Sequence, residues 1–562
     1  MNPSKLRLQL EELGIDFDSI KEDNIKNAIN LLFNIIEELS ALTSTLQEEN
    51  QKLKDEINKL KGEQGKPTIR PKTGSQGKED NISSEQDRAD KNKKKERKRE
   101  SKKDKIKITR TIKCTVDPEI LPEDAVLTAH ESVIVQDLKI EPDNIEFQKE
   151  IYYSPSLKKT YRGQLPLGYE GEFGPRIRSL IIIMKYCSNM SEPKILEFFR
   201  SFNIHISKGS ISNILTNNKE DFHKEKEEIY NGGLSSTRYQ QTDDTKARVK
   251  GENYHTHVMC NEFYTAYFTK KNKDRLTIID ILRGFRDRQY LYNEEAFNLL
   301  EQLRLSQKVK FKLLSFAKDK EYLEEDLERE LKKNIPDIGK IQKARILEAG
   351  AIASYHNETG SPVVEVLVCD DAPQFKLITW NLGLCWIHDG RHYKKLRPIV
   401  PYNEKKLKEF RSRYWDYYGK LLKFKFEPSE ESAQELSAEF DIIFSTKTGY
   451  EQLDERISKS KSKKDELLMV LKYPEIPLHN NASELGARAA VRRRDVSLHI
   501  KSDEGIKSSD TFMTIIQTAK KLGVNAYEYL FDRISKKFKL PSLADMIKKK
   551  TVGNELGYCD SG

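Results

Sequence analysis

The chain has 562 residues, of which 33% are charged and 37% hydrophobic, so it can bury a sizeable core and form roughly two to four folding units. The formal net charge of +9 fits a polyanionic partner without requiring one. Six scattered cysteines without a Cys-x-x-Cys pair argue against a disulfide framework and a four-cysteine zinc site, and no apolar run reaches the ~18 residues of a membrane span.

A heptad pattern in residues 1–62 predicts a coiled coil from about residue 26 to 62. Leucines recur every seven residues, with mostly polar residues between them. The d positions are Leu32, Leu39, Leu46, Leu53 and Leu60, and Asn50 lies at an a position. An asparagine there fixes the register of a parallel dimer, so we expect a homodimer or larger oligomer through this helix. The alternative is one long helix that packs on its own protein.

The next two segments differ in composition. Residues 63–108 combine helix-breaking glycines and prolines with a basic run at 91–107, which predicts a disordered linker. Such a linker either keeps the chain soluble or contacts DNA phosphates. Residues 109–165 alternate apolar and polar side chains around Val133 and Val135, which predicts short strands of a small β-rich domain.

Residues 166–235 are predicted to be helical and to contain a helix-turn-helix. Apolar helices at about 176–186 and 193–202 precede a third helix that begins at a capping serine, Ser207. In a helix-turn-helix, Lys208 and Ser210 of this third helix would face a DNA groove. Helical hairpins that do not read DNA are more common, so the pattern also fits an ordinary packed hairpin.

Residues 236–383 are predicted to form the first part of an α/β core. Polar and apolar residues alternate in three expected strands, at about 239–249, 255–260 and 264–269. Helical patterns fill about 276–350. A nearly continuous apolar strand at 363–371 then ends in two aspartates, as expected for a strand buried on both faces.

Three further parts complete the expected multi-domain α/β fold. A long, charged stretch at 384–475 predicts a helical insertion. Residues 476–540 form the second part of the core and include a helix that begins near Asn480. The remaining residues, 541–562, are expected to be a C-terminal tail.

Three carboxylates hold special positions in this expected core. Asp243 lies in the first strand, Asp370 ends the buried strand, and Glu484 lies just inside a helix start. Carboxylates at strand ends of a mixed sheet can converge in one crevice, where their oxygens suit Mg²⁺. Three such groups can hold two metal ions ~3.5–4 Å apart. Because crowded carboxylates repel each other, at least one should have a raised pKa without metal, although each acid alone is more often structural.

Arginines and a cysteine–histidine pair lie near these acids in the sequence. Arg488 is four residues after Glu484, so both lie on one helix face. The arginine run that follows could bind phosphates or simply form a solvated face; it comprises Arg492, Arg493 and Arg494. Cys385 and His388 are three residues apart, but two ligands do not close a metal site, so a buried structural pair is the preferred interpretation.

Several stretches together resemble the transposases of the insertion sequence 66 family. Leu53–Gly62 and Gly65–Pro67 resemble the leucine zipper of the family and the segment that follows it. Thr242–Thr245 resembles the block around the first catalytic aspartate of the family. The second aspartate, the Cys-x-x-His-x-x-Arg motif and the glutamate block are similar at Leu367–Asp370, Cys385–Arg391 and Asn480–Glu484 with Arg488. The closing segment is similar at Ser502–Gly505 and Leu522–Leu530. The resemblance spans about residues 30–532.

The resemblance implies a ribonuclease H-like core with an Asp-Asp-Glu triad and a helical insertion before the glutamate. It gives the catalytic and metal-binding roles to Asp243, Asp370 and Glu484, with two Mg²⁺ or Mn²⁺ ions. The zinc-finger-like segment of the family would fall near 111–160. Tyr152–Leu157 lacks its second cysteine pair, so we expect apolar packing there in place of zinc.

The resemblance also implies a function. We expect a DNA transposase that cuts the 3′ ends of its element and joins them to target DNA. Its expected partners are double-stranded DNA, both terminal inverted repeats and target, and a second copy of the chain, with no membrane and a bacterial cytoplasmic location. Two alternatives remain open: a repurposed, non-catalytic DNA-binding protein, and a metal-dependent nuclease or resolvase on the same core.

Overall fold

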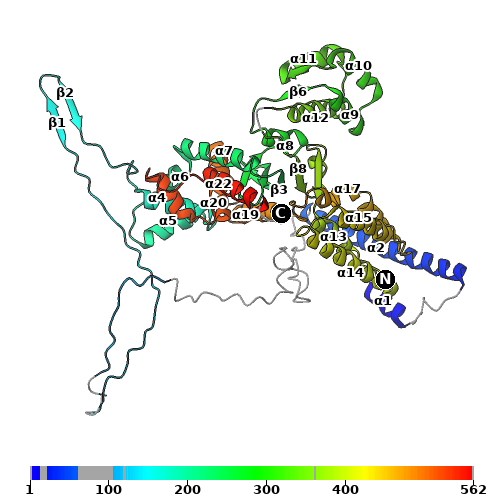
Figure 1. The fold of residues 1–562 in the computed structure, drawn as a ribbon, viewed down its shortest axis with the longest axis horizontal. Coiled ribbons are helices and arrows are strands. Elements are labelled where there is room, and N and C mark those ends of the chain that lie inside the picture. The colour runs from blue at the N-terminus through cyan, green and yellow to red at the C-terminus, as the bar shows by residue number, and fades with distance from the viewer. Residues whose placement is uncertain are drawn as a thin grey trace. The chain divides into compact units, whose positions relative to one another are not determined.

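Figure 1 shows the computed structural model, which describes most of the chain. The chain divides into two compact units. The described residues are 3–12, 22–60, 106–117, 120, 122, 125–359 and 362–559. The first unit comprises residues 1–70, 164–195 and 207–562, and the second comprises 71–163 and 196–206. Most of the expected basic linker, up to residue 105, lies outside the described residues. None of the described helices combines the length and hydrophobicity that crossing a bilayer requires.

A five-stranded mixed sheet, in the order β5-β4-β3-β8-β9, forms the centre of the first unit. The antiparallel strands are β3 (Tyr239–Val249), β4 (Glu252–Cys260) and β5 (Thr265–Lys270). The parallel strands are β8 (Val366–Cys369), which pairs with β3, and β9 (Asn381–Leu384), which pairs with β8. The sheet confirms the α/β prediction and the four expected strands, and it adds β9.

Helices cover this sheet and protect its edge. α19 (Asn481–Ser497) packs on β3 and β4, and α20 (Asp503–Leu522) packs on β5. Alternate β5 backbone N–H groups, at residues 265, 267 and 269, donate to side chains spaced four residues apart on α20. These acceptors are Thr518 (3.2 Å), Thr514 (3.1 Å) and Asp510 (2.7 Å). The helix therefore satisfies donors that an edge strand would otherwise leave open to pairing with another chain.

The helices that flank α20 begin with the expected hairpin region. They are α4 (Pro175–Tyr186), α6 (Lys208–Thr216), α7 (Glu220–Leu234), α21 (Ala526–Ile534) and α22 (Leu543–Cys559). In the chain, α5 (Glu192–Ser201) lies between α4 and α6. α6 begins as predicted, with Ser207 Oγ accepting the Ser210 backbone N–H. The prediction of a C-terminal tail is wrong, since α22 packs on α7 and α20 and buries Leu543 completely.

Between β5 and β8 the chain forms a small helical lobe. Its elements are α8 (Arg275–Leu282), β6 (Gln289–Leu291), α9 (Glu294–Gln302), α10 (Gln307–Ala317), β7 (Glu321–Leu323), α11 (Glu324–Asn334) and α12 (Lys340–His356). The helices confirm the pattern seen in the sequence. The short β6–β7 ribbon was not predicted, because three-residue strands carry too little alternation to recognise.

The predicted helical insertion is confirmed as a series of helices between β9 and α19. They are α13 (Trp386–Lys395), α14 (Pro401–Phe424), α15 (Glu430–Phe444), α16 (Glu451–Lys461), α17 (Lys464–Leu467) and α18 (Met469–Lys472). Trp386 is fully buried among the aromatic rings of α14 and α15. Its indole N–H donates to the Leu467 carbonyl (2.7 Å), which satisfies the one polar group of the ring.

The heptad segment forms one continuous helix, α2 (Asp23–Leu60), after a short α1 (Pro3–Glu12). Its d-position leucines are 55–84% exposed. A different face is buried: Phe33 packs on Val400, and Glu37 accepts the backbone N–H groups of Ile399 and Val400 at the start of α14. Packing on its own protein is therefore shown for the first half of α2, and the oligomer stays a prediction.

The second unit differs from the expected β-rich domain. Its strands are β1 (Ile151–Ser154) and β2 (Lys159–Arg162), which form one hairpin. Residues 125–150 contain no strand, and Val133, Val135 and Leu138 are 75–80% exposed. The expectation of apolar packing in place of zinc is therefore wrong. Alternation alone does not make a sheet where the chain supplies no surface to bury the apolar face.

Candidate active site

Strand pairing places Asp243 and Asp370 at the same level of two neighbouring strands. In the parallel β3–β8 pair, Gln241 lies opposite Val368, and each aspartate follows two residues later. Residues two apart on a strand share a face, so Asp243 lies on the face of Gln241. Asp370 comes directly after the last residue of β8, and its charge acts on Asp243. Their convergence depends on register, which the sequence alone does not give.

Glu484 reaches the same region from helix α19 because the helix lies unusually close to the sheet. A Cβ atom on Gly486 would lie 2.8 Å from Val258 Cγ1, so only glycine fits without a shift. The Tyr267 hydroxyl donates to the Gly486 carbonyl (3.0 Å) and holds the helix there. Glu484, two residues earlier, is consequently only 9% exposed.

The electrostatics show that the three acids share one environment. Burial raises the pKa of Asp243 to about 7, and the negative charges of Asp370 and Glu484 add to this effect. Burial also raises the pKa of Asp370, against the opposing influence of His388. The predicted crowding of carboxylates, with at least one raised pKa, is therefore confirmed.

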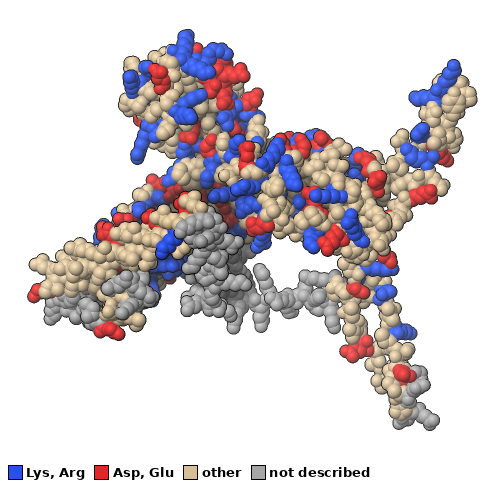
Figure 2. All heavy atoms as spheres, turned by 180° about the vertical axis from the view of Figure 1, so that it is seen from behind, with Lys and Arg blue, Asp and Glu red and all other residues tan. Residues whose placement is uncertain are grey.

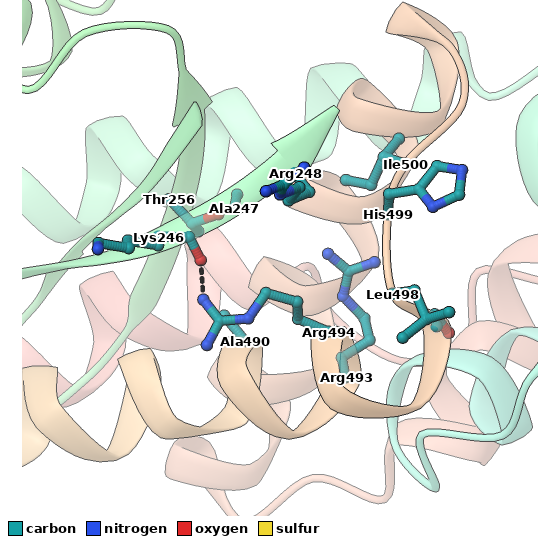
Figure 3. A pocket seen from close by; sticks show the side chains of 11 residues that line it. Lys246, Ala247, Arg248, Thr256, Ala490, Arg493, Arg494, Leu498, His499 and Ile500 are labelled. Atoms are coloured by element: carbon teal, nitrogen blue, oxygen red, sulfur yellow. Dashed lines mark hydrogen bonds between the residues drawn. The ribbon is translucent and has the colours of Figure 1, made fainter. Parts of the chain in front are cut away.

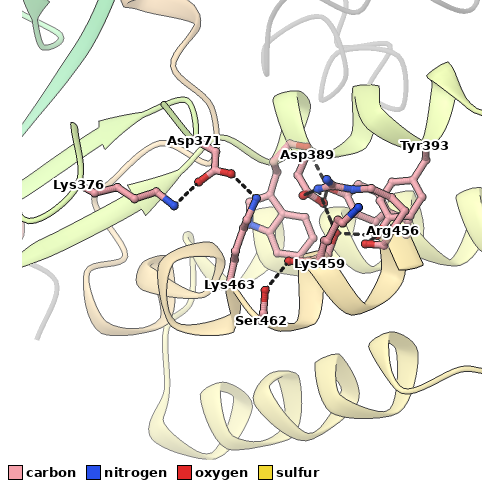
Figure 4. A network of polar contacts seen from close by, with 11 residues as sticks. Asp371, Lys376, Asp389, Tyr393, Arg456, Lys459, Ser462 and Lys463 are labelled. Carbon is pink, nitrogen blue, oxygen red and sulfur yellow. Dashed lines mark hydrogen bonds and ion pairs between the residues drawn. The ribbon is translucent and has the colours of Figure 1, made fainter. Parts of the chain in front are cut away.

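In each Asp-Asp pair the second aspartate is neutralised by the protein. Asp244 forms an ion pair with Lys273 (3.8 Å) and accepts a hydrogen bond from Gln374 Nε2 (2.8 Å). Asp371 lies between two lysines, pairing with Lys376 (2.8 Å) and Lys463, as Figure 4 shows. The first aspartate of each pair has no ion-pair partner among the described residues. The uncompensated charge thus belongs to the two positions that the sequence selected.

Glu484 is surrounded by residues of α13 as well as its own helix. Its Oε2 atom lies 3.2 Å from Arg488 Nη2 and 3.4 Å from Arg391 Nη2, and its Oε1 atom lies 3.6 Å from His388 Nε2. Arg488 is the helix-face neighbour expected from its spacing. The ligand atoms of Cys385, His388 and Glu484 all lie within 4.8 Å of one another. Sequence reasoning missed this group because its third member comes 96 residues after His388.

The members of the arginine run after Arg488 differ in exposure. Figure 3 shows Arg493 and Arg494 of this run lining a pocket beside Lys246. Arg492 is exposed. Arg493 is only 8% exposed, which removes it from the candidate phosphate contacts, and Arg494 donates to the Lys246 carbonyl on β3. The Arg494 hydrogen bond ties α19 to β3. Arg488 and Arg492 therefore remain the candidates of this helix for contact with a polyanion.

In the helix-turn-helix region, Lys208 is exposed and Ser210 is half-buried. The Ser210 hydroxyl lies 2.9 Å from Ser207 Oγ, so it belongs to the helix cap. Lys208 is consequently the better placed of the two predicted groove contacts.

A cavity of about 360 Å³ borders the acids on the side of the insertion. Asp370, Cys385 and His388 line one part of it, and Lys395 and Arg456 line another. Arg456 pairs with the buried Asp389 carboxylate, which also accepts from Ser460 Oγ (2.8 Å) and Tyr414 Oη (3.2 Å). This network fixes α13, and with it the side chains that face Glu484.

A comparison with known proteins finds one relative that this chain matches over almost the whole length of the relative. The chain is 36% identical over 315 residues to the uncharacterized protein y4jO of Sinorhizobium fredii (strain NBRC 101917 / NGR234), a stretch that makes up 54% of this chain and 94% of that protein. The chain belongs to the y4jO family. No family model matches the sequence.

The carboxylates of this y4jO-family chain fit a hard divalent cation. Asp243, Asp370 and Glu484 offer only oxygen donors, and the pKa of Asp243 is raised chiefly by burial and further by the charges of Asp370 and Glu484, which a bound cation would offset. The Cys385–His388–Glu484 group offers sulfur and nitrogen as well, which suits a softer ion. Glu484 belongs to both sets.

Proposed function

We propose that this chain is a DNA transposase whose catalytic, metal-binding acids are Asp243, Asp370 and Glu484. The observation that carries the proposal is the shared environment of these acids: burial raises the pKa of Asp243, and the nearby charges of Asp370 and Glu484 raise it further. The mixed strand order, with three antiparallel strands followed by two parallel ones, supports a ribonuclease H-like core. The helical insertion before the glutamate supports it further.

Two Mg²⁺ or Mn²⁺ ions held by these acids would activate the attacking oxygen and stabilise the leaving one. In the first reaction a water breaks the bond at the element's 3′ end and leaves a free 3′-hydroxyl. In the second, that hydroxyl attacks a target phosphodiester and releases a target 3′-hydroxyl. Each step forms one P–O bond and breaks one, so no other energy source is needed.

The remaining residues of the site hold the acids in position and approach the DNA. Arg391 and Arg488 contact the same carboxylate oxygen and orient Glu484. Both arginines are 43–51% exposed, so they can also contact a phosphate of the bound strand. Arg492 and Lys208 are further phosphate contacts. Because Figure 2 shows basic and acidic residues interspersed over the face that it displays, such specific arginines and lysines matter more than a broad field.

Two copies of the chain would hold two element ends together. The exposed leucines of α2 supply the pairing surface, and the docking of the first half of α2 on the insertion ties that surface to the catalytic unit.

The test is cleavage and joining of a terminal-repeat DNA by full-length protein with Mg²⁺. Asp243→Asn, Asp370→Asn and Glu484→Gln should each abolish cleavage and keep DNA binding. The matched controls Asp244→Asn and Asp371→Asn alter the neighbouring acid of each pair and should keep cleavage. Cleavage that survives any of the three site substitutions contradicts the triad. Cleavage without joined products indicates a nuclease or resolvase, and binding without cleavage by the wild type indicates a repurposed DNA-binding protein.

A further inference from the structure

We propose that Cys385, His388 and Glu484 form a Zn²⁺ site that withdraws Glu484 from the catalytic acids, so that zinc is a reversible inhibitor of this protein. The inference shares Glu484 with the proposed function, but zinc binding itself does not depend on any reaction with DNA.

Two helix starts bring the ligands together. Cys385 is the N-cap residue of α13, and His388 lies in the first turn of that helix. Glu484 lies in the first turn of α19. The Trp386 backbone N–H donates to the Leu478 carbonyl (3.0 Å), which ties the start of α13 to the segment before α19. The group is therefore held by fixed backbone on both sides.

The donor atoms are in a state that suits a metal ion. Arg391 Nη1 lies 2.9 Å from His388 Nε2, and because an arginine can only donate, this nitrogen is the acceptor and the ring is neutral. A metal ion would take over this lone pair from Arg391. Glu484 Oε1 is buried and has no hydrogen-bond donor among the described residues. Cys385 is 2% exposed and forms no disulfide. A neutral imidazole, an unpartnered carboxylate oxygen and a free thiol thus face one another.

The chemistry of this donor set favours zinc over magnesium. Zn²⁺ binds cysteine sulfur at ~2.3 Å and histidine nitrogen and carboxylate oxygen at ~2.0–2.2 Å, which sets ligand atoms ~3.5 Å apart in a tetrahedron. Donors within 4.8 Å of one another reach that spacing by small side-chain movements. Three protein ligands leave a fourth position for water. Mg²⁺ avoids sulfur and nitrogen, so the two metals compete only through Glu484.

Binding is tested on the full chain after chelator treatment, with Co²⁺ as a spectroscopic probe and Zn²⁺ as its competitor. We expect one tight equivalent per chain, with the thiolate-to-cobalt charge-transfer absorption that a cysteine ligand produces. Cys385→Ser should remove that absorption and weaken zinc binding at least ~100-fold, as for loss of a ligand or its support. The matched control Cys187→Ser, with an unchanged circular dichroism spectrum, should bind like the wild type. Equal zinc affinity in Cys385→Ser overturns the proposal.

A second pair of variants separates this site from the catalytic acids. Asp243→Asn should bind zinc like the wild type, because Asp243 is not a ligand, whereas Glu484→Gln should lose the site. Loss of tight zinc binding in Asp243→Asn would mean that zinc occupies the carboxylate triad, which overturns the proposal. A wild type that binds zinc as described but does not cleave DNA refutes the proposed function and leaves the zinc site standing.

Discussion

Replacing Asp243 with asparagine should make the protein more stable at alkaline pH. The substitution keeps the shape of the side chain and an oxygen that accepts the Asp244 backbone N–H, which Asp243 Oδ1 accepts at 2.8 Å. It removes a charge that burial, Asp370 and Glu484 all oppose. The site is thus arranged for function at a cost in stability, as is common where catalysis needs clustered charge.

The size of the effect follows from the pKa of Asp243, which the fold raises from 3.8 to about 7. A carboxyl group with a raised pKa keeps its proton longer in the folded than in the unfolded state. Its contribution to the free energy of unfolding is therefore complete below pH ~4 and is lost as the pH rises to ~7. At ~1.4 kcal/mol per pKa unit, the charged form costs the fold at most about 4 kcal/mol at pH 8.

Denaturation by urea at several pH values measures this cost. The three tryptophans, at positions 380, 386 and 415, all lie next to or within the insertion, so their fluorescence reports on the unit that holds the site. The stability gain of Asp243→Asn over the wild type should grow by about 2–3 kcal/mol between pH 5 and pH 8. Asp244→Asn, the neighbouring control, should show no such growth. An equal gain at both pH values, or a loss at pH 8, would refute this account of the site.

Two predictions concern the N-terminal helix. Glu37→Ala removes the acceptor of two backbone N–H groups at the start of α14 and should weaken the docking of α2 by about 2–4 kcal/mol. Hydrogen exchange along α2 should therefore become faster in Glu37→Ala and stay unchanged in the control Glu38→Ala. Unchanged protection of α2 in Glu37→Ala would contradict this contact. Leu46→Asp places a charge at a d position and should convert the oligomer to monomers in light scattering. Ser44→Asp adds the same charge on the outer face and should leave the mass unchanged; equal masses for both variants would exclude a zipper.

Much of the fold could be predicted from local pattern. The heptads, the alternation of β3, β4 and β5, and the apolar run of β8 each followed from the period of their own residues. Local pattern failed where burial needs a partner surface. Val133 and Val135 alternate like strand residues but remain exposed. Most of the tail expected at 541–562 instead folds as a helix, Leu543–Cys559, that packs against α7 and α20.

The candidate site shows the same division. Residue type and position singled out Asp243, Asp370 and Glu484, since acids at strand ends and helix starts are suited to metal binding. Which aspartate of each pair is left without a counter-charge was not decidable from sequence. Lys273 and Lys463, which form ion pairs with Asp244 and Asp371, lie far away along the chain or on another element.

The sequence by itself determined which residue types are available and where strands and helices begin, because hydrophobic period and capping are local properties. Only the tertiary structure decided what those residues do. The parallel register of β3 and β8 aligned two aspartates, and a glycine let α19 approach the sheet closely enough to add Glu484. The same packing placed Cys385 and His388 beside that glutamate. Pairwise distances and shared charge arise from chain segments meeting in space, and no local pattern encodes them.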